Sequence, residues 1–103
     1  MRLKTVEKLI KYADIRKGSG TTLGNHWVSV GSLKLSVTFG YHSTAIARVL
    51  FNHKTIEFDN GGWNTSSTNT ALRDYFGEYV VKRGYKDVTD YTKHADIRRR
   101  LYR

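Results

Sequence analysis

Four histidines are the residues best suited to metal binding or acid–base chemistry, and the chain carries them as His26, His42, His53 and His94. His42 and His53 flank one expected strand, and the β-β-α order that follows is similar to that of small metal-dependent nucleases. At about 3.3 Å per residue, the ends of this strand lie more than about 20 Å apart, too far to share a metal ion. The second expected helix has no histidine in its first turns. We therefore interpret the histidines as turn residues and predict neither a metal nor another cofactor.

The chain lacks the other common catalytic arrangements. The segment Gly18-Ser19-Gly20 does not continue into the Gly-Lys-Ser/Thr context of a phosphate-binding loop, and no Ser/His/Asp or paired-carboxylate pattern stands out. The sequence has no cysteine, which excludes disulfides, thiol catalysis, cysteine zinc sites and iron–sulfur ligation. We predict that the protein is not an enzyme.

The densest cationic segment runs from Ile97 to Arg103 and contains Arg98, Arg99 and Arg100. Guanidinium groups make bidentate contacts with phosphate or carboxylate groups, so the segment suits an anionic partner. A solvated basic tail would give the same pattern, because the run carries no base-reading geometry of its own. The sequence leaves both interpretations open.

Three tyrosines are interleaved with these cations: Tyr85, Tyr91 and Tyr102. Aromatic rings beside cations are what the bases and phosphates of a single strand require. The same rings would also serve to anchor the tail against the sheet. Of the two interpretations, the sequence favours anchoring.

The net charge of +9 is concentrated at the two ends of the chain. Residues 1–17 carry six Lys/Arg against two acids and residues 82–103 carry eight against three, whereas the middle is neutral. Such a field favours nucleic acid or an acidic protein surface as the partner. The predicted contact residues are cations of both flanks and one tyrosine: Lys4, Lys8, Lys11, Lys82, Arg83, Lys86, Lys93, Arg98, Arg99, Arg100, Arg103 and Tyr102.

The most distinctive local string is residues 60–68, NGGWNTSST. We interpret it as a strand-to-helix corner in which Gly61 and Gly62 adopt conformations closed to other residues. Trp63 would plug the end of the core, and the helix cap would be Ser67 or Thr68. The alternative, an anion bound by exposed N–H groups at the helix start, is favoured less.

The elements that position these residues belong to one predicted α+β domain over residues 1–103, because 103 residues fill a single core. Its aromatic content, seven Tyr, four Phe and two Trp, is sufficient for such a core. The apolar spacing of Leu3, Val6, Leu9, Ile10 and Ala13 predicts a basic amphipathic helix within residues 1–17. A flexible polar connection is expected over residues 17–22.

Residues 26–59 predict an antiparallel β-meander of about four strands. Gly31-Ser32 is expected as a two-residue hairpin turn with a positive φ at Gly31, followed by an alternation that turns Leu33 and Leu35 inward. In residues 44–51, Ala45 and Ala47 are expected on the same face. Residues 67–83 predict a C-terminal helix packed on the sheet, and residues 84–103 a basic C-terminal tail with helical character.

Two strings of the sequence resemble those of a known group of proteins: Tyr41-His42-Ser43-Thr44-Ala45-Ile46-Ala47 and Asn60-Gly61-Gly62-Trp63-Asn64-Thr65. The group consists of small uncharacterised proteins encoded by tailed bacteriophages, and the resembling span, residues 41–76, covers about a third of this chain. Such proteins commonly continue from the Trp into a Thr-Thr pair and a basic residue, where this chain has Ser67-Thr68-Asn69. The resemblance implies a viral origin and brings no known activity or site.

Two function classes follow from the charge and the resemblance. The first is a small non-enzymatic phage-encoded binding protein that engages nucleic acid through its basic flanks, with affinity that falls steeply with salt. The second is a host-takeover or anti-defence inhibitor that binds an acidic surface of a host protein. The chain has no apolar stretch near the roughly 20 residues needed to cross a bilayer, so we expect no membrane partner and a location in the cytoplasm of the infected host cell. Oligomeric state and the relative placement of the two basic ends stay open.

Overall fold

The computed structural model describes residues 3–15 and 20–102. Its helices are α1 (Leu3–Ile15), the 3-10 helix η1 (Ser32–Lys34), α2 (Ser66–Tyr75), the π-helix η2 (Phe76–Lys82) and α3 (Ala95–Leu101). Its strands are β1 (Gly20–Leu23), β2 (His26–Val30), β3 (Ser36–Tyr41), β4 (Thr44–Leu50), β5 (Thr55–Phe58) and β6 (Lys86–Asp87). The predicted α+β class, the N-terminal helix and the C-terminal helix are confirmed.

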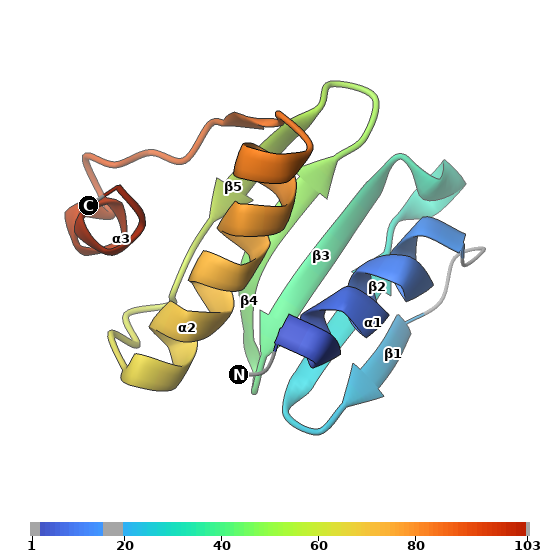
Figure 1. Ribbon diagram of the computed structural model, residues 1–103, viewed down its shortest axis with the longest axis horizontal. Helices are drawn as coiled ribbons and strands as arrows, with labels where there is room; N and C mark the ends of the chain where they lie inside the picture. The colour runs from blue at the N-terminus through green and yellow to red at the C-terminus, as the bar shows by residue number, and fades with distance from the viewer. Residues whose placement is uncertain (1–2, 16–19, 103) are drawn as a thin grey trace.

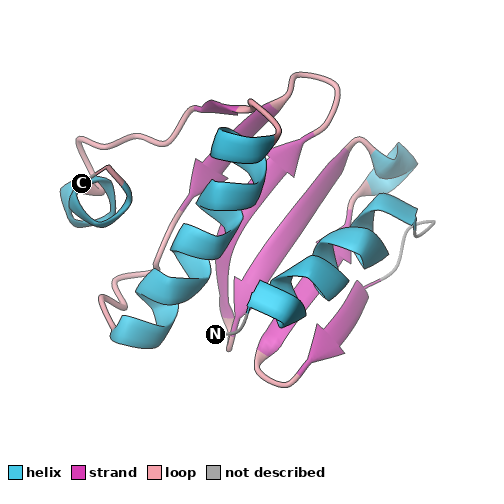
Figure 2. Ribbon diagram, viewed as in Figure 1, coloured by secondary structure: helices cyan, strands magenta, loops and turns pink. Residues whose placement is uncertain are grey.

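The strands form a single sheet in chain order, from β1 at one edge to β6 at the other. Neighbouring strands are antiparallel as far as β5, and β6 pairs with β5 in the parallel direction. Helices α1 and α2 cover the same face of the sheet, and α3 lies beyond α2 at the edge (Figure 1, Figure 2). The four antiparallel strands predicted over residues 26–59 correspond to β2–β5, but the sheet of the described residues also contains β1 and β6, so its six strands exceed the predicted four.

The strand β1 lies largely in the segment predicted as a flexible connection. Its residues, GTTL, contain one apolar side chain, so the sequence has no period-two signal there. Pairing with β2 across a turn at Gly24, where φ is 62°, orders the segment as an edge strand. Backbone hydrogen bonding, which leaves no trace in hydropathy, decides its structure.

The connection between β2 and β3 differs from the predicted two-residue hairpin. Gly31 has a φ of −75°, and the positive φ values fall at Leu33 and Lys34 in η1. Leu33 is 86% exposed and Leu35 is 45% exposed, so neither points into the core as expected. Gly31 is required for space instead, because a Cβ there would lie 2.2 Å from Ser36 Oγ.

A β-bulge changes which side chains of β4 enter the core. Phe39 pairs with Ala47 and Gly40 with Ala45, so Ile46 has no direct partner on β3. As a result Ile46 and Ala47 are both buried whereas Ala45 is exposed, contrary to the predicted alternation. Bulges re-aim side chains in this way.

The core lies between the sheet and the two long helices. From α1 come Val6, Leu9, Ile10 and Ala13, all buried, as the helical spacing predicts; the side chain of Leu3 lies outside the described residues. From the other helix, Ala71, Leu72, Tyr75 and Tyr79 are buried, within a continuous helical segment of residues 66–82 close to the predicted 67–83.

Two stacked aromatic rings join that helix to the centre of the sheet. Phe39 lies 4.3 Å from Tyr75, centroid to centroid, in a stacked arrangement, and 5.9 Å from Tyr79. Burial raises the pKa of both tyrosines, so their hydroxyls are neutral throughout the ordinary pH range. The helix is thus held in register by large rings of defined shape, and this fixes the position of its first turn.

Trp27 covers the other face of the sheet. It lies across Gly40, its partner residue on β3, and its indole Nε1 donates a 2.6 Å hydrogen bond to the carbonyl of His42. A Cβ at Gly40 would fall 1.8 Å from a ring carbon of Trp27. The glycine therefore makes room for the indole that holds the β3–β4 turn.

We predict that Gly40→Ala lowers the free energy of unfolding by about 1–3 kcal/mol, because the indole must leave its place and lose its hydrogen bond. Urea unfolding followed by tryptophan fluorescence checks this. Gly77→Ala is the matched control, since a Cβ at that helical glycine meets nothing within 4 Å and alanine favours a helix. Equal urea midpoints for Gly40→Ala and the wild type would contradict the account.

Candidate functional site: a cationic helix beside a corner pocket

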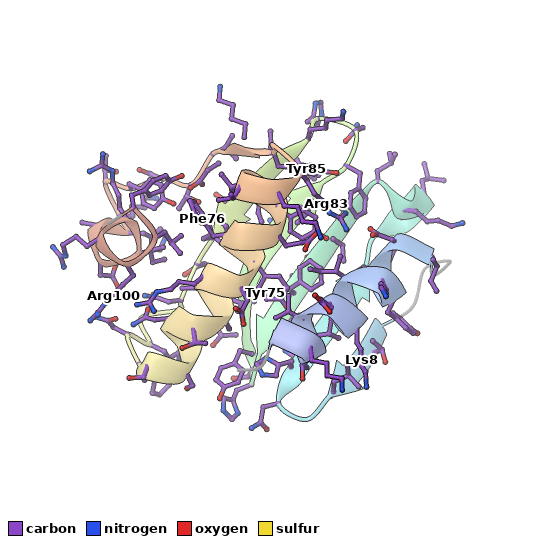
Figure 3. All side chains as sticks on the ribbon, viewed as in Figure 1. Lys8, Tyr75, Phe76, Arg83, Tyr85 and Arg100 are labelled. Carbon is purple, nitrogen blue, oxygen red and sulfur yellow. The ribbon has the colours of Figure 1, made fainter. Side chains whose placement is uncertain are left out.

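The C-terminal helix α3 is held against the body of the protein by one buried side chain and a group of tyrosines. Ile97 is completely buried, and the ring of Tyr102 meets Phe76 of η2 edge-on at 5.0 Å. Figure 3 shows Phe76 on the side of the helix that faces α3. The predicted basic tail is therefore a packed part of the fold.

A single carboxylate, that of Asp87 in β6, fixes the geometry of this segment. Its Oδ2 accepts hydrogen bonds from the hydroxyls of Tyr91 and Tyr102, the latter at 2.6 Å. Its Oδ1 accepts from the backbone N–H and the hydroxyl of Thr89, at 3.0 and 2.6 Å. Thr89 Oγ1 in turn accepts from the N–H of Phe58 in β5. The tail is thus hydrogen-bonded to the edge of the sheet.

The three tail tyrosines have the anchoring role that the sequence favours. Tyr85 packs edge-on against Tyr79 at 5.3 Å, and Tyr91 packs edge-on against Tyr102 at 5.9 Å. Burial, followed by the hydrogen bond to Asp87, raises the pKa of Tyr102 to about 12. The raised pKa values of Tyr91 and Tyr102 keep both hydroxyls protonated and donating to Asp87 at neutral pH.

The arginines of α3 lie at the surface of the protein. Arg98, Arg99 and Arg100 are all exposed, and none has an acidic partner among the described residues. Successive residues of an α-helix are turned by about 100°, so the three guanidiniums spread around the outer surface of α3. They form a fan of unpaired positive charge on a helix whose position is fixed.

The other predicted contact residues divide into free and paired groups. Lys86 and Lys93 are exposed, and so are the α1 lysines, Lys4, Lys8 and Lys11. Lys82 is exposed but lies 3.7 Å from Glu78, and Arg103 lies outside the described residues.

The side chain of Arg83 forms ion pairs within the protein. It lies 3.2 Å from Asp14 of α1 and 2.8 Å from Glu78 of η2, and its guanidinium sits over the ring of Tyr79 at 5.0 Å. These contacts join the end of η2 to α1. The side chain of Glu78 is only 11% exposed, and it accepts a hydrogen bond from this arginine.

The cations of α1 and those of α3 do not merge into one patch, although Lys82 and Arg83 of the C-terminal flank line a hollow together with Lys11 of α1. Helix α1 and helix α3 lie on opposite sides of α2 (Figure 1), and Figure 3 shows Lys8 and Arg100 at opposite sides of the molecule. A ligand that contacts α3 therefore meets a cationic surface separate from the α1 lysines.

A pocket of about 360 Å³ lies at the corner between the β3–β4 turn and the start of α2. The turn supplies Tyr41, His42, Ser43 and Thr44, and Ile46 lies at the bulge of β4. The opposite wall comes from the loop and first turn of the helix: Asn60, Trp63, Thr65, Ser67 and Thr68. Both strings that carry the phage resemblance line this pocket, although the sequence interpretation assigned them to structure alone.

The loop before α2 is built around two glycines, as predicted. Gly61 and Gly62 have φ values of 59° and 87°, and a Cβ at Gly61 would lie 2.7 Å from Thr44 Cγ2. The N–H of Gly62 donates to Asn60 Oδ1 at 2.9 Å, and the N–H of Trp63 donates to the Asn60 carbonyl at 2.8 Å. This tight turn directs Trp63 outward.

Two details of the predicted corner are wrong. Trp63 does not plug the core, because it is 62% exposed at the mouth of the pocket. The helix cap is Thr65 rather than Ser67 or Thr68, since Thr65 Oγ1 accepts from the N–H of Thr68 at 3.3 Å. The cap stands one turn earlier because the glycine turn ends at Trp63.

The corner is joined directly to the cationic helix. Asn60 is buried, and its Nδ2 donates a 2.7 Å hydrogen bond to Asp96 in the first turn of α3. Asp96 is the acid in the first turn of α3, so the hydrogen bond ties the start of this helix to the corner. The pocket and the arginine fan are therefore parts of one surface region.

The four histidines do not form a metal-binding cluster among the described residues. The residues that the structure describes contain no group of three or more His, Cys, Asp or Glu side chains arranged for a metal ion. His42 and His53 lie in separate turns, and burial lowers the pKa of the His26 imidazole, whose ring lies tilted against that of Tyr41 with the centroids 4.6 Å apart. Within the same residues, none of the helices has the length and apolar character required to cross a membrane.

Comparison of the chain with protein-family models, with curated proteins and with solved structures finds no match. The candidate site therefore depends on geometry alone. The sequence predicts the arginines as contact residues, and this stays a prediction. It did not predict the pocket, because the exposure of Trp63 that marks it depends on the fold.

We predict that Asp87→Asn loosens α3. A neutral amide oxygen carries less negative charge than a carboxylate oxygen, so it accepts the two tyrosine hydrogen bonds more weakly. The expected result is trypsin cleavage after the α3 arginines at least about tenfold faster than in the wild type, with residues 20–75 equally protected. Asp90→Asn is the matched control, since Asp90 is exposed and bonds only within its own turn, to Thr92. Equal cleavage rates for Asp87→Asn and Asp90→Asn would refute the anchoring role.

Proposed function

We propose that this protein is a small non-enzymatic nucleic-acid-binding protein that engages its ligand through α3. The observation that carries the proposal is the fan of Arg98, Arg99 and Arg100, exposed and unpaired on a helix that the Asp87 network holds in place. Arginines on a fixed helix bind phosphates with less loss of backbone freedom than those of a disordered tail would. The origin implied by the resemblance, a tailed bacteriophage, belongs to the same proposal.

The neighbourhood of α3 supports nucleic acid over a simple acidic surface. An exposed indole, that of Trp63, belongs to a pocket whose described lining has no carboxylate side chain, and the lining residue Asn60 is hydrogen-bonded to the first turn of α3. Cations beside an aromatic platform are the combination that single strands use, with phosphates on the charges and bases on the rings. The α1 lysines provide a second cationic surface for a longer ligand.

A second candidate is the inhibitor that docks on an acidic surface of a host protein. The separation of the α1 lysines from the α3 arginines favours this function, because one acidic patch on a host protein needs only one cationic helix. Exposed apolar side chains such as Leu33 and Val81 would then supply burial at an interface. Capture of one host protein from nuclease-treated lysate, lost in the arginine variant described below, would select this function.

The test is fluorescence-anisotropy binding to 12-nucleotide single- and double-stranded DNA and RNA across a salt series. We predict that replacing Arg98, Arg99 and Arg100 by Ala weakens binding at least about tenfold at 0.15 M salt. It also reduces the slope of log K against log salt by about 2 on single strands, as expected for three lost phosphate contacts.

The matched control replaces Lys4, Lys8 and Lys11 by Ala, which removes the same charge from α1. A smaller loss than in the arginine variant is the expected result, because α3 carries the primary contact. Equal losses would mean that net charge alone drives binding, and absence of binding to all four ligands would reject the function.

A further inference from the structure

We infer that the corner pocket accepts one nucleotide, with its base against Trp63 and its phosphate at the start of α2 and the arginines of α3. This rests on the proposed function, which it deepens by naming the subsite and the unit recognised. The nucleotide is either a free mononucleotide or an unpaired residue of a strand. Both present the same base and phosphate to the pocket.

The first argument is the exposure of Trp63. A tryptophan in a small α+β domain normally buries most of its surface, yet this one is 62% exposed at the end of a rigid glycine turn. The loop is tied down by the hydrogen bonds of Asp59 and Asn60 to its own backbone, so the indole is held outward by structure. An aromatic ring positioned in this way offers a face for a base.

The second argument is the size and lining of the cavity. Ligand pockets measure roughly 300–1,000 Å³, so about 360 Å³ suits a single nucleotide and excludes a large cofactor. Ile46, brought in by the bulge of β4, provides an apolar surface, and Tyr41 provides a second ring. The ring of Tyr41 is itself fixed between His26 and His42, at 4.6 and 4.4 Å.

The third argument is the set of polar groups at the pocket. The hydroxyls of Thr44 and Ser67 line it and suit hydrogen bonding to a base edge or a phosphate. Ser66 and Ser67 occupy the first two positions of α2, where backbone N–H groups have no acceptor within the helix, whereas that of Thr68 is taken by the Thr65 cap. The lining contains no carboxylate side chain that would repel a phosphate.

The fourth argument is the direct connection to α3. The Asn60–Asp96 hydrogen bond of 2.7 Å places the base of the arginine helix against the wall of the pocket. A strand whose phosphates lie on Arg98, Arg99 and Arg100 therefore passes the pocket within the same surface region. One unstacked base can enter it while the neighbouring phosphates stay on the helix.

The first arm of the experiment is ¹H–¹⁵N NMR of the whole chain with adenosine or uridine 5′-monophosphate at millimolar concentration. We expect shifts of the Trp63 indole N–H and of the amides of residues 65–68. Inorganic phosphate and the corresponding nucleosides are the control probes. Equal shifts with phosphate alone would overturn the proposal, because the site would then bind an anion without recognising a base.

The second arm compares Trp63→Ala with Trp63→Phe in binding of the 12-nucleotide single strand. We expect Trp63→Ala to lose about tenfold or more in affinity, within the range that base–aromatic stacking gives, and Trp63→Phe to stay within about threefold of the wild type. Leu33→Ala is the matched control, because Leu33 is an exposed apolar residue, at 86%, that does not line the pocket. Unfolding midpoints equal to the wild type show that the variants fold.

The outcomes separate this inference from the proposed function. Strand binding that depends on the arginines but not on Trp63, with no pocket resonance moved by either mononucleotide, overturns the pocket and leaves the function. Shifts with mononucleotide but no strand binding keep the pocket as a free-nucleotide site and reject the function. Loss of strand binding in Trp63→Ala without mononucleotide shifts identifies the ligand as a residue of a strand.

Discussion

The carboxylate of Asp87 accepts hydrogen bonds from two tyrosines and a threonine that belong to the last part of the chain. A charged acceptor shared among several donors is worth more than neutral hydrogen bonds of the same number. Because β6, which carries Asp87, pairs with β5, the network joins the tail to the sheet rather than to another loop. Without it, α3 would keep the packing of Ile97 and Tyr102 and the hydrogen bond from Asn60 to Asp96, and its arginines would be held less firmly.

Placement, more than the number of charges, distinguishes the cations of this protein. Arg83 is held by Asp14 and Glu78 and stabilises the contact between α1 and η2. Arg98, Arg99 and Arg100 form no ion pair with the acids that the structure describes, and Asp96, at the start of α3, accepts a hydrogen bond from Asn60. Within the C-terminal flank, the same residue type therefore supports the fold at position 83 and stays available for a ligand at positions 98–100.

Much of the fold could be predicted from hydropathy. The buried stripes of α1 and of residues 66–82 follow a helical period, and the strands β2 to β5 follow a period of two or a buried run. The edge strand β1 could not, because its Gly and Thr residues are ordered by backbone pairing with β2. The alternation in β4 also failed, since a bulge is set by the partner strand and shifts Ile46 without any change of composition.

The candidate site was predictable only in part, for a related reason. Charge is visible in the sequence, so the arginines of α3 were found, but which cations are paired depends on contacts such as that of Arg83 with Asp14, 69 residues apart. The pocket needs the β3–β4 turn and the NGGW loop to meet, and it needs Trp63 to point outward. Local reasoning placed that tryptophan in the core, because apolar residues next to a helix start usually enter it.

The central claim is that α3 and the adjoining corner form one ligand-binding surface. Ultraviolet crosslinking of a 12-nucleotide strand, followed by mass spectrometry of the crosslinked peptides, tests it most directly. The account predicts crosslinks in the peptides of residues 59–73 and 94–102, with few in those of α1. Crosslinks confined to α1, or spread evenly over all cationic peptides, would contradict it.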